Sequence, residues 1–69
     1  MSRYSEDPVE IEDVRVLRTT ELALCCEFSD GHIAWIPISE TFDDTNLKEE
    51  GDEGTLVIPE WLAEKEGLI

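Results

Sequence analysis

Large apolar residues occupy every second position between residues 22 and 28, and this alternation constrains the fold more than any other feature of the chain. Successive side chains of a strand point to opposite faces, so the pattern predicts a strand. Asp30 and Gly31 follow, and glycine accepts the positive φ that a hairpin turn needs. We therefore predict that residues 32–38 return as a second strand. The predicted faces are Leu22, Leu24, Cys26 and Phe28 against Ala23, Cys25 and Glu27, and Ala34, Ile36 and Ile38 against Ile33 and Trp35.

Two further segments have the composition of strands. Residues 9–16 alternate apolar and polar side chains, with an interruption at Glu12 and Asp13 where we expect an irregularity. Residues 55–58 are a brief apolar run with two β-branched members, long enough for one short strand. Pro37 cannot donate a ladder hydrogen bond, which places the end of its strand at a sheet edge or at the strand's exit.

The last eleven residues have the signals of a short helix. Pro59 is a residue favoured in the first helical turn, and Gly67 stands where a helix cap is expected. The helix between them presents Trp61, Leu62 and Lys65 on one face, and the closing residues 68 and 69 are expected to fold back under it. Residues 39–53 are ambiguous between turns and a short helix start. Their apolar anchors are Phe42 and Leu47.

Together these segments predict a β-rich α+β fold: a three- to four-stranded antiparallel sheet, open or curled into a small barrel, with one short C-terminal helix. Residues 1–8 lack hydrophobic periodicity and are predicted to be a flexible N-terminal tail, and residues 9–69 a single small domain. A domain of 69 residues has little stability to spare. A partner or self-association, as a homodimer or larger oligomer, is therefore expected to help it.

Charge excludes several classes of function. The chain has 18 Asp and Glu residues against five Lys and Arg, a formal charge of −13. Direct nucleic-acid binding needs a cationic face that five scattered bases hardly build. Neither a long apolar run nor a basic amphipathic helix points to a membrane, and no secretory signal is visible. Adjacent Cys25 and Cys26 are expected to be reduced thiols, with Cys26 in the core, which is typical of a cytoplasmic protein.

Catalytic and metal-binding arrangements are weakly indicated. His32 is the one histidine, and Cys25, Glu27 and His32 lack a supporting third group or an oxyanion site. Two adjacent cysteines and a histidine do not have zinc-site spacing, and the acids between Asp43 and Glu50 lack the spacing of a calcium-binding EF-hand. No phosphate-binding glycine loop is present. We therefore expect a protein that is not an enzyme and that needs no cofactor or metal.

The acidic residues are the strongest remaining signal. Ten carboxylates fall between residues 40 and 66, opposed there by two lysines, and overlapping fields make such a surface attractive to basic protein grooves. A scaffold with carboxylates at phosphate-like spacing competes with nucleic acid for Lys and Arg. A solubilising surface and adaptation to a salty cytoplasm are the alternatives. The residues predicted to bind a partner are Glu40, Asp43, Asp44, Glu49, Glu50, Asp52 and Glu53.

A second hypothesis rests on the aromatic residues. Trp35 and Trp61 are more often core residues than ligand platforms. If one is exposed in a groove, it stacks on a base while an arginine meets a phosphate. The residues of this alternative ligand site are Trp35, Trp61, Arg15, Arg18 and His32.

Two motifs carry a family resemblance. Residues 30–39 read DG..AWIP.S and residues 51–68 read GDEG.L.I..W.A.K.GL. Both are similar to segments shared by a widespread group of small uncharacterised phage and prophage proteins. The resemblance implies a short accessory gene of a mobile element that is expressed in the bacterial cytosol. It transfers no catalytic activity.

Combined with the charge, this context favours an inhibitor of host defence that occupies the basic nucleic-acid-binding surface of a CRISPR effector complex or nuclease. An oligomeric sponge that sequesters a nucleotide immune signal is the alternative. A phage replication or recombination accessory protein is the third hypothesis.

Overall fold

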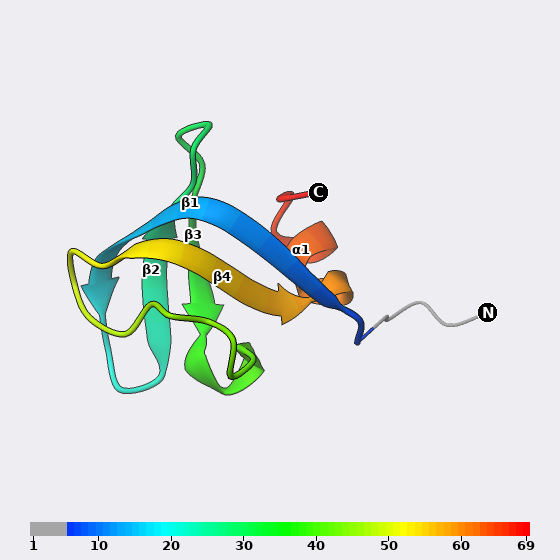
Figure 1. Cartoon of the computed structure of the whole chain (residues 1–69). Helices are drawn as coiled ribbons and strands as arrows, with labels where there is room; N and C mark the ends of the chain where they lie inside the picture. Colours follow the sequence, from blue (N-terminus) through cyan, green and yellow to red (C-terminus); the bar gives the residue numbers. More distant parts are fainter. Residues whose placement is uncertain (1–5) are drawn as a thin grey trace.

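A computed structural model describes residues 6–69, which form four antiparallel strands and one short α-helix (Figure 1). The strands are β1 (Pro8–Thr19), β2 (Ala23–Glu27), β3 (Ile33–Pro37) and β4 (Glu53–Pro59), and the helix is α1 (Glu60–Lys65). A single 3-10 turn, η1 (Ile38–Glu40), follows β3. The sheet is open, with the order β3-β2-β1-β4. The predicted β-rich α+β fold is confirmed, in its open form.

The longest strand, β1, belongs to both halves of the sheet. Its first part pairs with β4 and its second part with β2, and Arg15 alone has partners on both sides, Glu53 and Glu27. Within the part that pairs with β4 the register shifts between Ile11 and Val14, where Asp13 has a φ of 59°. This confirms the irregularity predicted at residues 12 and 13. Such a bulge bends a strand, and Figure 1 shows β4 lying across the directions of β2 and β3.

The predicted hairpin is formed by β2 and β3. Gly31 has a φ of 90° and donates its N–H to the Phe28 carbonyl over 2.8 Å, and the Asp30 carboxylate accepts the His32 N–H. The predicted strand ends are wrong. Leu22 is 80% exposed, because the Thr20 hydroxyl accepts the N–H groups of residues 22 and 23 and forms a turn there. At the other end Ile38 begins η1 and is exposed.

The core lies between the bent sheet, the helix and the connection from β3 to β4. Alternation places one set of side chains from every strand inside. Leu62 and Ala63 bring α1 onto this cluster, and Leu47 adds the connecting segment. The strand residues of the core are Val14, Val16, Leu24, Cys26, Ala34, Ile36, Leu56 and Ile58, with Phe28 beside them.

The outer edge of β4 is covered by residues 42–46. Phe42 donates its N–H to the Val57 carbonyl over 2.9 Å, and the Thr45 hydroxyl accepts the Val57 N–H over 2.8 Å. Asn46 accepts the Thr55 N–H with its side-chain oxygen. Leu47 is buried and Phe42 is partly buried, as expected of apolar anchors. These contacts satisfy backbone groups that an edge strand otherwise exposes, and β4 starts two residues earlier than predicted.

The helix ends as the sequence predicts but begins later. Gly67 has a φ of 75° and donates its N–H to the Glu64 carbonyl, while Leu68 donates to Ala63, a Schellman cap. Pro59 is the last residue of β4 and precedes the helix instead of lying in its first turn. Leu68 packs against the core, whereas Ile69 is exposed.

Two residues of the predicted tail contact the start of the helix. The Glu60 N–H donates to the Asp7 carbonyl over 2.9 Å, and the Trp61 indole N–H donates to the Glu6 carboxylate over 2.7 Å. Pro8 is already part of β1. The remainder of the predicted tail, residues 1–5, lies outside the described residues.

The bulge in β1 generates a prediction about two neighbouring acids. Glycine at position 13 removes the cost of holding a side chain in the left-handed region, whereas glycine at position 12 adds backbone freedom to the unfolded chain without such relief. Glu12→Gly is expected to lower the free energy of unfolding by about 1 kcal/mol, and Asp13→Gly to leave it unchanged or raise it. Both variants remove one carboxylate. Urea denaturation measures the free energy of unfolding of both variants. An equal loss of stability in the two would contradict the prediction.

Candidate functional site

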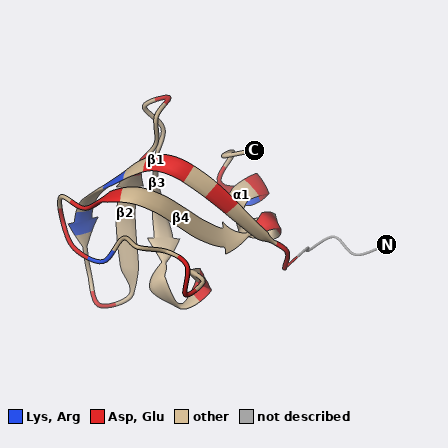
Figure 2. Cartoon of the chain, in the orientation of Figure 1, with Lys and Arg blue, Asp and Glu red and all other residues tan. Residues whose placement is uncertain are grey.

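The seven carboxylates predicted to bind a partner lie in residues 38–53, which comprise the connection from β3 to β4 and the first residue of β4 and which we call the acidic loop. Figure 2 shows them as two separate groups at the two ends of this loop. The first group follows β3, around the partly buried Phe42, and the second surrounds the turn that leads into β4. The first group is Glu40, Asp43 and Asp44, and the second is Glu49, Glu50, Asp52 and Glu53.

The acidic loop is tied to the sheet at both groups. Near the first group, Thr45 and Asn46 hold it against β4. Near the second, the Val16 N–H donates to the Asp52 carbonyl and the Gly51 N–H donates to the Val16 carbonyl, each over 2.8 Å. These bonds fix the backbone of the loop to β1 and β4, so the residues that carry its carboxylates have defined positions on the sheet.

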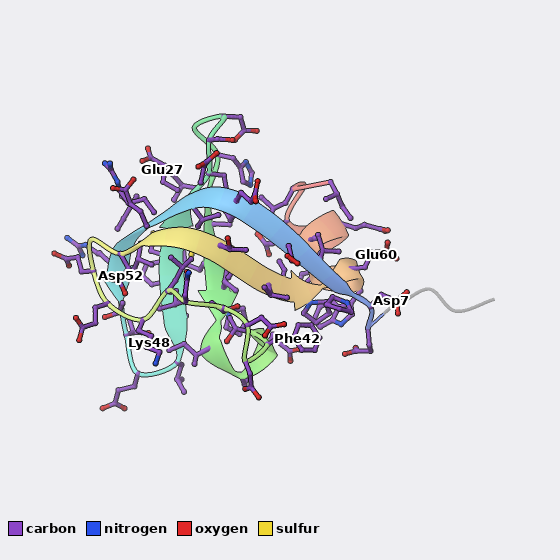
Figure 3. The ribbon with its side chains drawn as sticks, in the orientation of Figure 1. Asp7, Glu27, Phe42, Lys48, Asp52 and Glu60 are labelled. Carbon is purple, nitrogen blue, oxygen red and sulfur yellow. The ribbon has the colours of Figure 1, made fainter. Side chains whose placement is uncertain are left out.

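Two of the seven acids have partners among residues 6–69. The Asp52 carboxylate accepts the backbone N–H groups of Glu49 and Lys48, each over 2.9 Å, and these hydrogen bonds hold the pKa of Asp52 below its usual value (Figure 3). Glu53 forms an ion pair with Arg15 over 3.4 Å. Asp52 therefore holds the turn together. The acids without a partner among the described residues are Glu40, Asp43, Asp44, Glu49 and Glu50.

Other carboxylates extend the negative surface beyond the loop. Figure 2 shows them on β1, on the hairpin turn, beside the N-terminal end of β1 and on α1. Arg15 and Arg18 are the cations of β1, and Lys48 and Lys65 lie in the loop and the helix. Among residues 6–69 the ion pair between Arg15 and Glu53 is the single one. The negative field is thus largely uncompensated within the described part of the chain.

The residues of the alternative ligand site are distributed over different surfaces. The sheet register aligns Trp35, Cys25 and Arg18 in one row across three strands. His32 lies beyond the paired part of β3, with its ring 6.2 Å from that of Phe28. Trp61 lies on the helix, against Glu6. The structure brings Trp35 and Arg18 to one face of the sheet but does not gather all five residues into one pocket.

The two tryptophans differ in burial. Trp35 is 49% exposed on the outer face of β3, so the prediction that it is a core residue is wrong. Its alternate position to buried Ala34 and Ile36 explains the exposure, since no element covers that side of β3 among the described residues. Trp61 is partly buried and packs against the core.

Hollows lie beside the acidic loop and beside Arg15. The larger, about 490 Å³, lies between the acidic loop and the sheet and is lined mainly by apolar and hydroxyl side chains together with Asp43 and Lys48. The smaller, about 300 Å³, contains Arg15 beside Asp13, Glu27 and Glu53. Three carboxylates around one guanidinium form a poor site for a phosphate. The larger hollow is lined by Leu24, Ile38, Thr41, Phe42, Asp43, Thr45, Leu47 and Lys48.

The cysteines and the histidine do not form a nucleophilic pair. Cys25 is paired with Trp35 in the sheet, and His32 lies beyond the last pair, Glu27 and Ile33. Both cysteines are free thiols and both are buried. Burial, and to a smaller extent the neighbouring Cys25, raises the pKa of the Cys26 thiol to about 11. Cys26 therefore acts as an apolar core residue, as predicted.

Residues 6–69 contain neither a metal-binding cluster nor a helix suited to a membrane. No three His, Cys, Asp or Glu side chains lie together in a way that could hold a metal ion. None of the described helices has the length and apolar character needed to cross a membrane. Comparison of the chain with protein-family models, with curated proteins and with solved structures finds no match.

Sequence reasoning missed the residues that position the acidic loop. Thr45, Asn46 and Asp52 hold it through side-chain hydrogen bonds to backbone groups. Thr, Asn and Asp are the residue types that form such bonds in turns, so their presence was a signal. The β4 partners of Thr45 and Asn46 are nine or more positions away in the sequence, and no local pattern identifies them. The partners of Asp52 are local, the N–H groups of Lys48 and Glu49.

Burial of Cys26 predicts a slow thiol. In the natural protein, a pKa of about 11 instead of 9.0 lowers the Cys26 thiolate fraction at pH 8 by about a hundredfold. A Cys25→Ser variant keeps the burial, which is the larger cause, and leaves Cys26 as the single thiol. We expect labelling by a thiol reagent to be at least that much slower in the native protein than in the urea-unfolded chain. Equal rates in the two states would contradict the buried position.

The lowered pKa of Asp52 predicts a pH-dependent contribution to stability. The contribution is present above the unfolded-state pKa and is lost as the pH falls through the lower folded-state value. The stability advantage of the natural protein over Asp52→Asn should therefore shrink as the pH falls from 5 to 2, as measured by urea denaturation. Asp44→Asn removes the same charge from the same loop and is the control. An advantage that grows on acidification would refute the assignment.

Proposed function

We propose that the protein is a non-enzymatic, phage-type binding protein that antagonises a host defence complex in the bacterial cytoplasm. Its acidic loop occupies the basic nucleic-acid-binding surface of a CRISPR effector or nuclease. Bound there, it competes with DNA or RNA for the cationic side chains of that surface. The protein makes no direct contact with nucleic acid in this scheme.

The observation that carries the proposal is the fixed position of the acidic loop. Thr45 and Asn46 hold one end of the loop on β4, and Asp52 closes the turn at the other end. Around these two anchors the loop carries five carboxylates that have no partner among the described residues. A preordered surface loses less conformational entropy on binding than a flexible acidic segment, so more of the electrostatic attraction remains as affinity.

The charge of the whole chain supports the same partner class. With a net charge of −13 and a screening length of about 8 Å at physiological salt, the fields of neighbouring carboxylates overlap. Such a field accelerates encounter with a cationic groove and repels nucleic acid. The sponge hypothesis has less support, because Trp61 and His32 lie away from Trp35 and the hollow beside Arg15 is rich in carboxylates.

The test uses variants with matched charge changes. Bacterial cells that produce the protein are challenged with a panel of CRISPR effectors and nucleases in a plasmid-interference assay, and an inhibited complex is then purified for binding measurements. The Glu49→Gln, Glu50→Gln double variant is expected to bind about tenfold more weakly, since each exposed pair contributes about 0.2–1 kcal/mol. The Glu64→Gln, Glu66→Gln double variant removes the same charge from the C-terminal helix and its cap, and should bind nearly normally.

Three results would overturn the proposal. Equal weakening in the two double variants would show that bulk charge, and not the loop, determines binding. Binding that does not weaken between 50 and 300 mM salt would contradict an electrostatic contact. Protection of no defence target, together with co-purification of a phage helicase, primase or single-strand-binding protein, would favour the replication hypothesis.

A further inference from the structure

The two edge strands of the sheet differ in whether other residues cover them. Residues 42–46 cover β4 and accept or donate hydrogen bonds at Thr55 and Val57. The other edge is β3, and no described residue pairs with its outer side. An uncovered strand edge is a template for a further strand.

The hydrogen-bond pattern identifies which groups of β3 face outward. Phe28 donates its N–H to the His32 carbonyl, and Ile38 donates to the Leu22 carbonyl, each over 2.8 Å. In an antiparallel pair such bonds recur at every second residue, so even-numbered positions of β3 face β2. The outward groups are therefore the N–H and C=O of Ile33 and Trp35 and the C=O of Pro37, which has no N–H to leave unpaired.

Exposed apolar side chains lie beside these groups. Ile33 is 53% exposed and Trp35 is 49% exposed, both on the outer face of the sheet. A strand added beside β3 would place alternate side chains against them. The indole ring of Trp35 also offers a face to a Lys or Arg side chain.

Charge indicates the chemistry of the added strand. No Lys or Arg occurs between Arg18 and Lys48, whereas this stretch contains six carboxylates. Glu27 is paired with Ile33, Asp30 lies in the turn before β3, and Glu40 lies in the 3-10 turn after it. An extended segment with Lys or Arg at alternate positions is complementary to this edge. A second copy of the chain would bring like charges together.

We propose that the outer edge of β3 binds an extended cationic segment of a partner protein, which adds to the sheet as a fifth strand. Main-chain hydrogen bonds to Ile33 and Trp35 give the segment its register, and apolar and cationic side chains contact the outer face. This surface is at the opposite edge from the strand that the acidic loop covers. It is tested without reference to any defence complex.

The experiment titrates the full chain, labelled for NMR, with a capped seven-residue peptide of alternating Lys and Val. We expect shifts of the Ile33 and Trp35 amides, protection of these two amides from hydrogen exchange, and weaker binding at higher salt. An alternating Glu and Val peptide is the control and should not bind. Shifts confined to residues 40–53 would place the peptide on the acidic loop and overturn the proposal for β3.

Two pairs of variants separate backbone pairing from general attraction. Ile33→Pro removes an outward N–H that β2 does not use. It is expected to lower the affinity for the peptide of alternating Lys and Val at least about tenfold. Ile33→Val keeps that N–H and should bind nearly normally. Trp35→Lys places a cation on the edge and should lower the affinity for the peptide to a similar degree. Leu22→Lys adds the same charge at the exposed turn before β2 and should leave the affinity unchanged.

The variants also give results that would reject the proposal. Unchanged affinity in Trp35→Lys and in a folded Ile33→Pro protein would show that the edge is not used. The natural protein could instead sediment as a dimer that becomes more stable at higher salt and that the Ile33→Pro substitution dissociates. This result would assign the edge to a second copy of the chain. Circular dichroism establishes that each variant is folded.

Discussion

The bend of β1 at its bulge is the constraint on which the remaining structure depends. A flat four-stranded sheet has one apolar face that a six-residue helix cannot cover. Because β1 changes partners at Arg15, the pair of β1 with β4 turns across the hairpin of β2 and β3, and the sheet encloses much of its own core (Figure 1). The helix then needs to add little more than Leu62 and Ala63 to that core.

The position of the acidic loop follows from the same bend. Val16, just after the point where β1 changes partners, exchanges backbone hydrogen bonds with residues 51 and 52 of the loop. The far end of the loop is held by β4, which the first part of β1 positions. The carboxylates are thus displayed by a connection that is anchored on both sides of the bend. The stability of the core and the placement of the charges therefore both depend on the bend of β1.

Local patterns were sufficient to predict the hairpin, the bulge and the helix cap, because each depends on residues close in the sequence. Gly31, Asp13 and Gly67 all have the positive φ that their local turns require. The coverage of β4 by residues 42–46 was not predictable in this way, since it joins groups such as the Phe42 N–H and the Val57 carbonyl, which are far apart in the sequence. Exposure of Trp35 was missed for a related reason: alternation predicts two faces of β3, but only the tertiary structure decides which one is covered.

The contrast between the two edges links the fold to its candidate partners. A loop protects β4, whereas β3 is short and carries Pro37 at its end, devices that limit edge pairing without abolishing it. Like charge provides a third restraint, because two copies of a chain with 13 excess negative charges repel each other. That restraint disappears for a cationic segment and is replaced by attraction. The acidity that opposes self-association would thus favour the basic partner proposed for this edge.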